Sequence, residues 1–224
     1  MKQLYLVANW KSNKTVDEAK EWISKIKDQR SKIKDYKNLQ IVLCAPYTVL
    51  ATLKVEIEKA KLPIHLGAQD ISPFGKGAYT GEINADMLKG LIEYVLVGHS
   101  ERRKYFHEKE EELSFEALQA HSANFQIIYC IEDKDRKVPE FVDIIAYEPI
   151  VAIGSGKAEN PEDAQRVCKQ IKEKHTNIPI LYGGSVTPEN IAMYLKQPSI
   201  DGALVGGASL DPERFFHLIE ASFV

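Results

Sequence analysis

Eight short apolar runs recur along the 224-residue chain, and they constrain its fold more than any other feature. The runs begin at Leu4, Gln40, Ile64, Val95, Gln126, Ile144, Pro179 and Gly202. Each is long enough for one strand and is apolar on both alternating faces, which is typical of parallel strands that are covered on both sides. Their spacing is close to the roughly 30 residues of a strand with its crossover helix. The chain is therefore predicted to repeat a βα unit eight times.

Four of the intervals begin with a helix-start signal. Thr15 and Glu18 have the spacing of a capping box, and apolar residues follow them at helical spacing. Three other signals place a capping side chain before a proline and a glutamate, at Asn160, Thr187 and Asp211. Proline suits the first turn of a helix, and an acid suits its positive end. A helix is therefore predicted to begin at each of these four places.

Three further intervals are predicted to hold helices on composition and apolar spacing, at residues 49–61, 110–123 and, as a shorter element, 84–94. The interval between the fifth and sixth runs differs, because it contains a charged stretch and Pro139 within a short length. It has no room for a full helix. The fifth crossover helix is therefore predicted to be absent or strongly shortened.

Eight βα units can be arranged in either of two folds. No Gly/Ser-rich linker or change of composition divides the chain, so residues 1–224 are predicted to form a single domain. The units could close into a (β/α)8 barrel or lie in an open, doubly wound sheet. We favour the barrel because closure removes both exposed sheet edges. All strands then end around one mouth, where function is expected.

The overall charge and the cysteine pattern exclude several partners and compartments. The net charge of −3 and the pI near 6.1 remove the bulk attraction to nucleic acid or an anionic membrane. The N-terminus lacks the apolar stretch of a signal peptide, and no run approaches the ~18 apolar residues of a membrane span. Cys44, Cys130 and Cys168 are odd in number and lack C-x-x-C spacing, which indicates a reducing compartment. We therefore expect a soluble, cytoplasmic protein.

Polar residues at the ends of the first and fourth runs are candidates for chemistry at the mouth. Asn9 and Lys11 are two residues apart, so a strand sends both to the same side, and the lysine suits an anionic ligand. His99 leaves an apolar run where Ser100 could cap a following helix. The positive end of a helix disfavours the imidazolium, so His99 is predicted to be a neutral donor or acid. Taken singly, each of these residues could also be structural or solvated.

Glu148 ends the sixth run and precedes Pro149, which restrains the glutamate to extended backbone at the mouth. It is a candidate general base, because partial desolvation would raise its affinity for a proton. Taken alone, it could instead be an exposed acid at the end of a strand. The following residues, 150–157, are largely apolar and contain two glycines, which is unusual for a loop in open water. This loop is predicted to be a lid.

Two Gly-Gly pairs end the seventh and eighth runs, at residues 183–184 and 206–207. Without side chains, their N–H groups can approach a ligand closely. Barrel enzymes frequently hold phosphate at the loops after the seventh and eighth strands. One pair would indicate only a tight turn, but two pairs on adjacent strands favour a phosphate site.

Six motifs, in order along the chain, resemble the triosephosphate isomerase family. They are residues 9–11 (NWK), 99–103 (HSERR), 146–149 (AYEP), 152–157 (AIGSGK), 182–185 (YGGS) and 204–209 (LVGGAS). Because they extend over nearly the whole chain, the resemblance is far more specific than a single glycine motif. It implies a TIM barrel that interconverts dihydroxyacetone phosphate and D-glyceraldehyde 3-phosphate in glycolysis and gluconeogenesis, with no metal or organic cofactor.

The resemblance also implies a role for each catalytic candidate. Glu148 is the base that moves a proton between two substrate carbons through an enediolate, and His99 is the neutral imidazole that polarises the carbonyl. This pairing is the established pattern of the family rather than a deduction from this chain. Asn9 and Lys11 orient the substrate, and Lys11 also balances its negative charge. Glu101 holds Lys11 in place.

For phosphate binding, the resemblance implies four residues: Gly154, Ser185, Gly206 and Gly207. Their contacts with the phosphate would hold the lid closed. Binding energy from the phosphate, which does not itself react, would thus help to lower the barrier at the reacting carbons. Closure would also keep water away from the enediolate, which can otherwise lose its phosphate. The substrate is thus expected to be a small phosphorylated three-carbon sugar.

Residues 71–83 form a long connection that contains Phe74 and Tyr79, and such loops usually have a function. In the family this loop enters the neighbouring subunit, where it would bring Thr80 close to Asn9 and Lys11 of that subunit. A homodimer is therefore expected, and a higher oligomer is left open. A surface Ω-loop is the alternative, although it would leave both aromatic rings exposed.

The chain departs from the family around the lid. Val151 stands where the family usually has a tryptophan, Ser155 replaces a threonine, and Asp133 replaces a glutamate at the end of the fifth run. The chemistry of the lid hinge is therefore changed. Two other functions stay open on sequence alone, namely a different enzyme of the phosphate-binding barrel class and a non-catalytic phosphate-binding barrel. The presence of both His99 and Glu148 favours the isomerase.

Overall fold

A computed structural model describes residues 2–149 and 158–223. The strands are β1 (Leu4–Asn9), β2 (Leu39–Ala45), β3 (His65–Ala68), β4 (Tyr94–Val97), β5 (Gln126–Ile131), β6 (Ile144–Tyr147), β7 (Ile180–Tyr182) and β8 (Gly202–Val205). The α-helices are α1 (Val16–Ile26), α2 (Arg30–Asp35), α3 (Tyr47–Ala60), α4 (Ala85–Leu88), α5 (Ser100–Tyr105), α6 (Glu110–Ser122), α7 (Pro161–Lys174), α8 (Ile191–Leu195) and α9 (Pro212–Ala221). Two 3-10 helices complete the set, η1 (Lys27–Gln29) and η2 (Gly207–Ser209).

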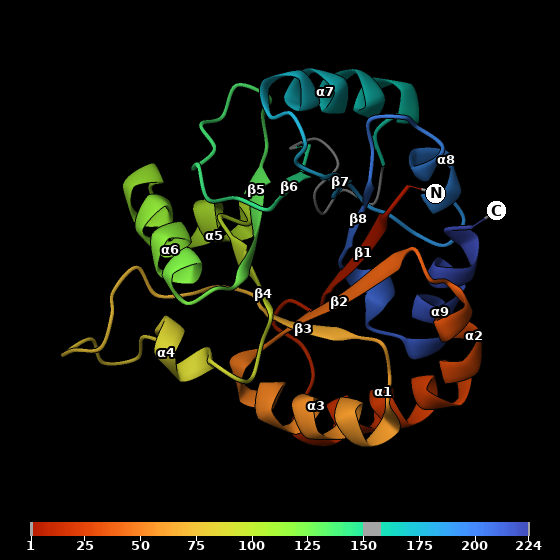
Figure 1. Ribbon diagram of the computed structural model, residues 1–224, viewed down its shortest axis with the longest axis horizontal. Helices are drawn as coiled ribbons and strands as arrows, with labels where there is room; N and C mark the ends of the chain where they lie inside the picture. Colours follow the sequence, from red (N-terminus) through yellow and green to blue (C-terminus); the bar gives the residue numbers. More distant parts are fainter. Residues whose placement is uncertain (1, 150–157, 224) are drawn as a thin grey trace.

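The eight strands form a closed barrel in which each strand pairs in parallel with its neighbours in sequence. The barrel closes where β8 pairs with β1, with Val7 opposite Leu204. The helices surround the barrel in Figure 1. Each of the eight predicted runs contains one strand, and the closed barrel is confirmed over the open sheet. Within the described residues, none of the helices has the length and apolar character needed to cross a bilayer.

Three of the four predicted helix starts are confirmed by side-chain caps. The Thr15 hydroxyl accepts from the Glu18 N–H, and the Glu18 carboxylate accepts from the Thr15 N–H at 2.7 Å, as a capping box requires. The Asn160 side chain accepts from the Glu162 N–H, and the Asp211 side chain accepts from the Arg214 N–H, each at 2.8 Å. These bonds use N–H groups that the first helical turn leaves free.

The fourth predicted start, at Thr187, is wrong by three residues. The α-helix α8 begins at Ile191 and follows Asn190. The Asn190 side chain accepts from the Thr187 N–H at 2.8 Å and donates to the Ser185 carbonyl at 3.2 Å. These bonds hold residues 188–190 in a turn, so the helix begins only after it.

The connection between β5 and β6, residues 132–143, contains no helix. Its side chains cover this part of the barrel. Val142 is buried in the main core cluster, and Val138 packs against that cluster. The Phe141 ring stacks on His121 of α6, with their centroids 4.4 Å apart. Figure 1 shows the connection running beside β5 and β6 between α6 and α7.

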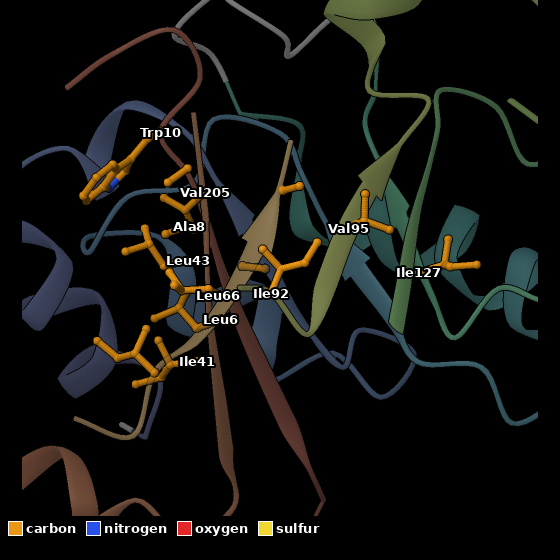
Figure 2. Packing of buried hydrophobic residues seen from close by; sticks show 14 of the residues in the cluster. Leu6, Ala8, Trp10, Ile41, Leu43, Leu66, Ile92, Val95, Ile127 and Val205 are labelled. Carbon is orange, nitrogen blue, oxygen red and sulfur yellow. The ribbon is translucent and has the colours of Figure 1, made fainter. Parts of the chain in front are cut away.

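Alternate residues of each strand divide the core into two layers. Leu6 and Ala8 of β1 belong to the cluster between barrel and helices, whereas Val7 belongs to the cluster inside the barrel. Figure 2 shows part of the outer layer, including Leu43, Leu66, Val95, Ile127 and Val205. The inner layer includes Val42, Cys44, Leu96, Ile128, Cys130, Ala146, Leu181 and Leu204. The barrel is therefore filled, and only its mouth can hold a ligand.

A pair of tryptophans joins the first and last parts of the chain. The indole N–H groups of Trp10 and Trp22 both donate to the carbonyl of Ser209, at 3.3 and 3.1 Å. The two rings meet edge to face with centroids 5.3 Å apart, and Trp22 also contacts Phe215 of α9. Both indoles are fully buried. These contacts hold α1 and α9 together beside the β1–β8 seam.

We predict that Trp22→Ala lowers the free energy of unfolding by about 3–5 kcal/mol, because it removes a large buried ring together with a hydrogen bond. Urea unfolding followed by far-UV circular dichroism measures this change. Ser24→Ala, an exposed position on the same helix, should change the free energy by less than about 0.5 kcal/mol. A loss below about 1 kcal/mol for Trp22→Ala would contradict the role given to the seam.

Candidate active site

The inward alternation of the strands carries three polar residues to the barrel mouth. On β1, Val7 faces the interior, so Asn9 and then Lys11 continue the same side beyond it. On β6, Ala146 faces the interior and Glu148 follows two residues later. Asn9 and Glu148 are buried, with exposed fractions of 4% and 3%. The predicted strand-end residues therefore converge at the carboxyl end of the barrel.

His99 reaches the same place by a break in the alternation of β4. Leu96 faces the interior, so a continued strand would turn residue 99 toward the outer layer. Gly98 instead has φ of 71°, a left-handed conformation that favours glycine, and α5 begins directly after His99. His99 is buried and its Nε2 lies 3.0 Å from Glu148 Oε1. The turn at Gly98 thus brings the imidazole to the carboxylate.

The cap of α5 is His99 rather than Ser100, which corrects the sequence prediction. The His99 Nδ1 accepts the Glu101 N–H at 3.2 Å, while Ser100 is the first helical residue. Its hydroxyl is buried with no hydrogen-bond partner in the part of the chain that the structure describes. Because Nδ1 accepts this N–H, Nε2 is the ring nitrogen left to donate, and it faces Glu148.

Glu148 is held as a carboxylate by its neighbours. Its Oε2 accepts the Ser100 N–H at 2.9 Å, and Oε1 faces His99. Burial alone raises the pKa of Glu148, but His99, the Ser100 N–H and Lys11 together outweigh burial and leave that pKa below its ordinary value. The sequence-based prediction that desolvation raises the affinity of Glu148 for a proton is therefore wrong for this arrangement. In this arrangement the carboxylate is ionised and can accept a proton.

Lys11 is fixed in an uncommon backbone conformation, with φ of 53°. The Asn9 side chain accepts the Lys11 N–H at 2.9 Å, and the Gln69 side chain donates to the Lys11 carbonyl at 3.0 Å. The Lys11 ammonium forms an ion pair with Glu101, as the resemblance implies. Gln69 was missed by the sequence analysis, although its place just beyond β3 makes it a strand-end polar residue like the others.

One cavity of about 270 Å³ collects these residues. Its lining is Asn9, Lys11, His99, Glu148, Gly183, Ser185, Val186, Leu204, Gly206 and Gly207. A side chain at Gly183 would come within 3.0 Å of the Glu148 Cγ, so the glycine leaves room for the carboxylate. The structure therefore brings together every predicted site residue except Gly154. Gly154, with Val151, Ser155 and the rest of the predicted lid, lies outside the described residues.

A larger cavity of about 800 Å³ lies beside α5 and α6. Part of its charged lining is paired: Glu110 accepts from Arg103 at 2.6 Å and from Arg136 at 2.7 Å, and Arg136 also pairs with Glu132 at 2.8 Å. None of the predicted catalytic residues Asn9, Lys11, His99 and Glu148 lines this cavity. The smaller cavity at the mouth is the better candidate for catalysis.

Comparison with known proteins identifies the family of this chain. The triosephosphate isomerase family model matches residues 4–142 and 139–222. The chain is 40% identical to the triosephosphate isomerase of Mesomycoplasma hyorhinis, with 98% of each chain covered. It is also 40% identical to that of Gloeothece citriformis (98% and 99% covered) and 36% identical to that of Alkaliphilus metalliredigens (98% and 99%). The chain belongs to the triosephosphate isomerase family.

Proposed function

We propose that the protein is a triosephosphate isomerase that interconverts dihydroxyacetone phosphate and D-glyceraldehyde 3-phosphate, with Glu148 as base and His99 as electrophile. The observation that carries the proposal is the 3.0 Å approach of His99 Nε2 to Glu148 Oε1 inside the mouth cavity. An ionised carboxylate beside a neutral N–H donor suits proton transfer next to a carbonyl. A barrel that only binds phosphate would not need this pair of groups.

Substrate would replace the contacts that Glu148 makes in the ligand-free cavity. When Glu148 leaves His99 and the Ser100 N–H, it loses hydrogen bonds that favour its charged form, while it stays buried. Its pKa then rises, which strengthens it as a base at the moment of proton transfer. Glu148 takes the proton from one carbon and returns it to the neighbouring carbon.

His99 would stabilise the oxygen charge that forms during this transfer. The Nε2–H, released from Glu148, donates to the substrate carbonyl and gives its proton to that oxygen in the enediolate, and Nε2 then takes the hydroxyl proton from the oxygen on the neighbouring carbon. A single well-placed donor of this kind contributes about 2.7–4 kcal/mol, and a general base about 10²–10⁴ in rate. Lys11 adds positive charge, and Asn9 fixes the Lys11 backbone. The catalysis is therefore shared among these groups, and it needs no metal or organic cofactor.

The phosphate would bind at the other side of the cavity, where Ser185, Gly206 and Gly207 line the wall. Main-chain N–H groups of glycines can approach a phosphate without obstruction from side chains. Gly154 is proposed as a further contact, from a lid formed by residues 150–157. Lid closure over the phosphate would exclude water from the enediolate.

We also propose that the chain acts as a homodimer that forms through residues 71–83. In Figure 1 this loop projects away from the barrel, beyond α4. Phe74 and Tyr79 stack with centroids 4.3 Å apart, yet they are 46% and 45% exposed. A projecting, exposed aromatic pair suits a pocket on a second copy, and it would place Thr80 near the catalytic residues of that copy.

We propose that residues 1–224 form one domain and that the protein works in the cytoplasm. The three cysteines Cys44, Cys130 and Cys168 are buried and free, and burial raises the pKa of their thiols. Free thiols of this kind suit a reducing compartment.

For the proposed base, we predict that Glu148→Asp lowers kcat by two or more orders of magnitude, because the shorter carboxylate no longer reaches the substrate carbons. Binding of a phosphate-bearing substrate analogue should change by less than about tenfold. A coupled triose-phosphate assay and a calorimetric titration measure the two quantities. Glu140→Asp, at an exposed position, serves as control. Analogue binding by the unaltered protein without any turnover would instead support the non-catalytic barrel.

For the proposed dimer, we predict that the double change Phe74→Ala and Tyr79→Ala produces a monomer with greatly reduced activity, because the loop loses its aromatic anchor. Analytical ultracentrifugation gives the mass, and assays over a dilution series report whether activity depends on association. Met193→Ala, at a half-exposed apolar position of α8, is the matched control. A monomeric but fully active unaltered protein would overturn the proposal.

A further inference from the structure

A cluster of acidic side chains lies apart from the mouth cavity. Asp70 follows β3, Glu108 lies between α5 and α6, and Glu116 belongs to α6. One carboxylate oxygen from each residue lies within 4.8 Å of those from the other two. Glu116 is only 3% exposed, and the Glu108 side chain is 8% exposed. Residues distant in sequence thus place three carboxylates together in a largely dry region.

Arg102 provides the positive charge that the described residues bring to this cluster. Its Nη2 bonds to Asp70 Oδ2 at 2.7 Å, and its Nε bonds to Glu108 Oε1. Glu116 forms no ion pair with any described residue. When all three acids are ionised, three carboxylates and one guanidinium leave an excess of two negative charges.

The other oxygens of these carboxylates are unsatisfied. Asp70 Oδ1, Glu108 Oε2 and Glu116 Oε2 are all buried, and none has a hydrogen-bond partner within residues 2–149 and 158–223. The neighbouring cation, Arg103, donates its hydrogen bonds to other groups, namely the Gly98 and Cys130 carbonyls and Glu110. Buried carboxylates without partners are strongly destabilising, so these groups are neutralised either by protons or by a further positive group.

We propose that Asp70, Glu108 and Glu116 bind one hard divalent cation, such as Ca²⁺, Mg²⁺ or Mn²⁺, through one carboxylate oxygen each. Carboxylate oxygens are the ligands that such ions prefer, at about 2.0–2.6 Å, so ligands of one ion lie at most about 5 Å apart. One oxygen from each of the three carboxylates meets that limit. The ion's two charges match the excess on the cluster, and water completes its coordination.

Protons are the natural competitors of such an ion. Burial raises the pKa of Glu116 to about 9 and that of Asp70 to about 7. The charged groups that face these two acids are Arg102 of α5, Glu108, Glu112 of α6 and Glu82 of the loop after β3, and the Tyr47 hydroxyl of α3 donates to the Asp70 carbonyl. A cation and these protons therefore compete for the same carboxylates.

In the absence of the ion, the raised pKa values of these two acids make the stability of the fold depend on pH. Because the folded pKa values of Asp70 and Glu116 lie above the ordinary values of the unfolded chain, the folded state binds more protons than the unfolded state between about pH 4 and pH 9. Stability from this cluster is therefore present at low pH and is lost as the pH rises through the folded values.

The bound ion would brace the structure beside the active site. It joins the end of β3 to α6 and to the segment between α5 and α6. Arg102, which holds two of the ligands, directly follows Glu101, the ion-pair partner of Lys11. The ion is therefore a structural support and takes no part in the proposed proton transfers.

The test uses the full chain after dialysis against a chelator. Thermal unfolding and isothermal titration calorimetry are followed while Ca²⁺, Mg²⁺ or Mn²⁺ is added at pH 8. We expect one saturable site per chain and a rise in Tm of several degrees. Glu116→Gln should weaken binding at least tenfold, whereas Glu111→Gln, exposed on the same helix, should leave it unchanged.

A second variant keeps the proposal testable if Glu116→Gln folds poorly. Glu116→Lys places a fixed positive charge where the ion is proposed, so it should fold, raise Tm in chelator and abolish the response to cations. No saturable binding up to about 10 mM, or equal binding by Glu116→Gln, overturns the proposal. Stability that rises with protein concentration but not with cations would assign the positive group to a second copy of the chain and would also overturn it.

Discussion

The alternation of side chains in a closed parallel barrel is the constraint on which the rest of this structure depends. Because the interior is filled by Val7, Ala146 and their neighbours, the same inward side of each strand leads only to the mouth. Asn9 and Glu148 are the next residues on that side, and the pairing of β8 with β1 brings Gly206 and Gly207, the proposed phosphate contacts, next to them. The fold thus fixes the positions of the polar groups before any ligand arrives.

Within that frame, the proposed chemistry depends on the two nitrogens of His99. The Glu101 N–H donates to Nδ1, and Nε2 faces Glu148. His99 and Glu148 therefore satisfy each other, which offsets part of the free-energy cost of burying both. The same helix start supplies the Ser100 N–H to Glu148. A substrate would bind by placing its own polar atoms against these groups, in place of the contacts that they make with one another.

Much of this could be predicted from the sequence, because strand runs, caps and strand-end residues are local patterns. The failures have physical causes that lie beyond the local pattern. Ser100 has a better intrinsic capping side chain than His99, but the turn at Gly98 brings the imidazole to the helix N-terminus instead. The pKa of Glu148 depends on contacts with residues far away in the chain, which spacing does not reveal. The acidic cluster around Glu116 is assembled only by folding.

The most direct test of this account is the ¹⁵N NMR spectrum of the His99 side chain in protein with labelled histidine, assigned by comparison with a His99→Asn variant. The account predicts a neutral ring at neutral pH, with the proton on Nε2 and none on Nδ1, both in the free protein and with a phosphate-bearing analogue bound. A proton on Nδ1 in either state, whether in an imidazolium or in the other tautomer, would contradict it.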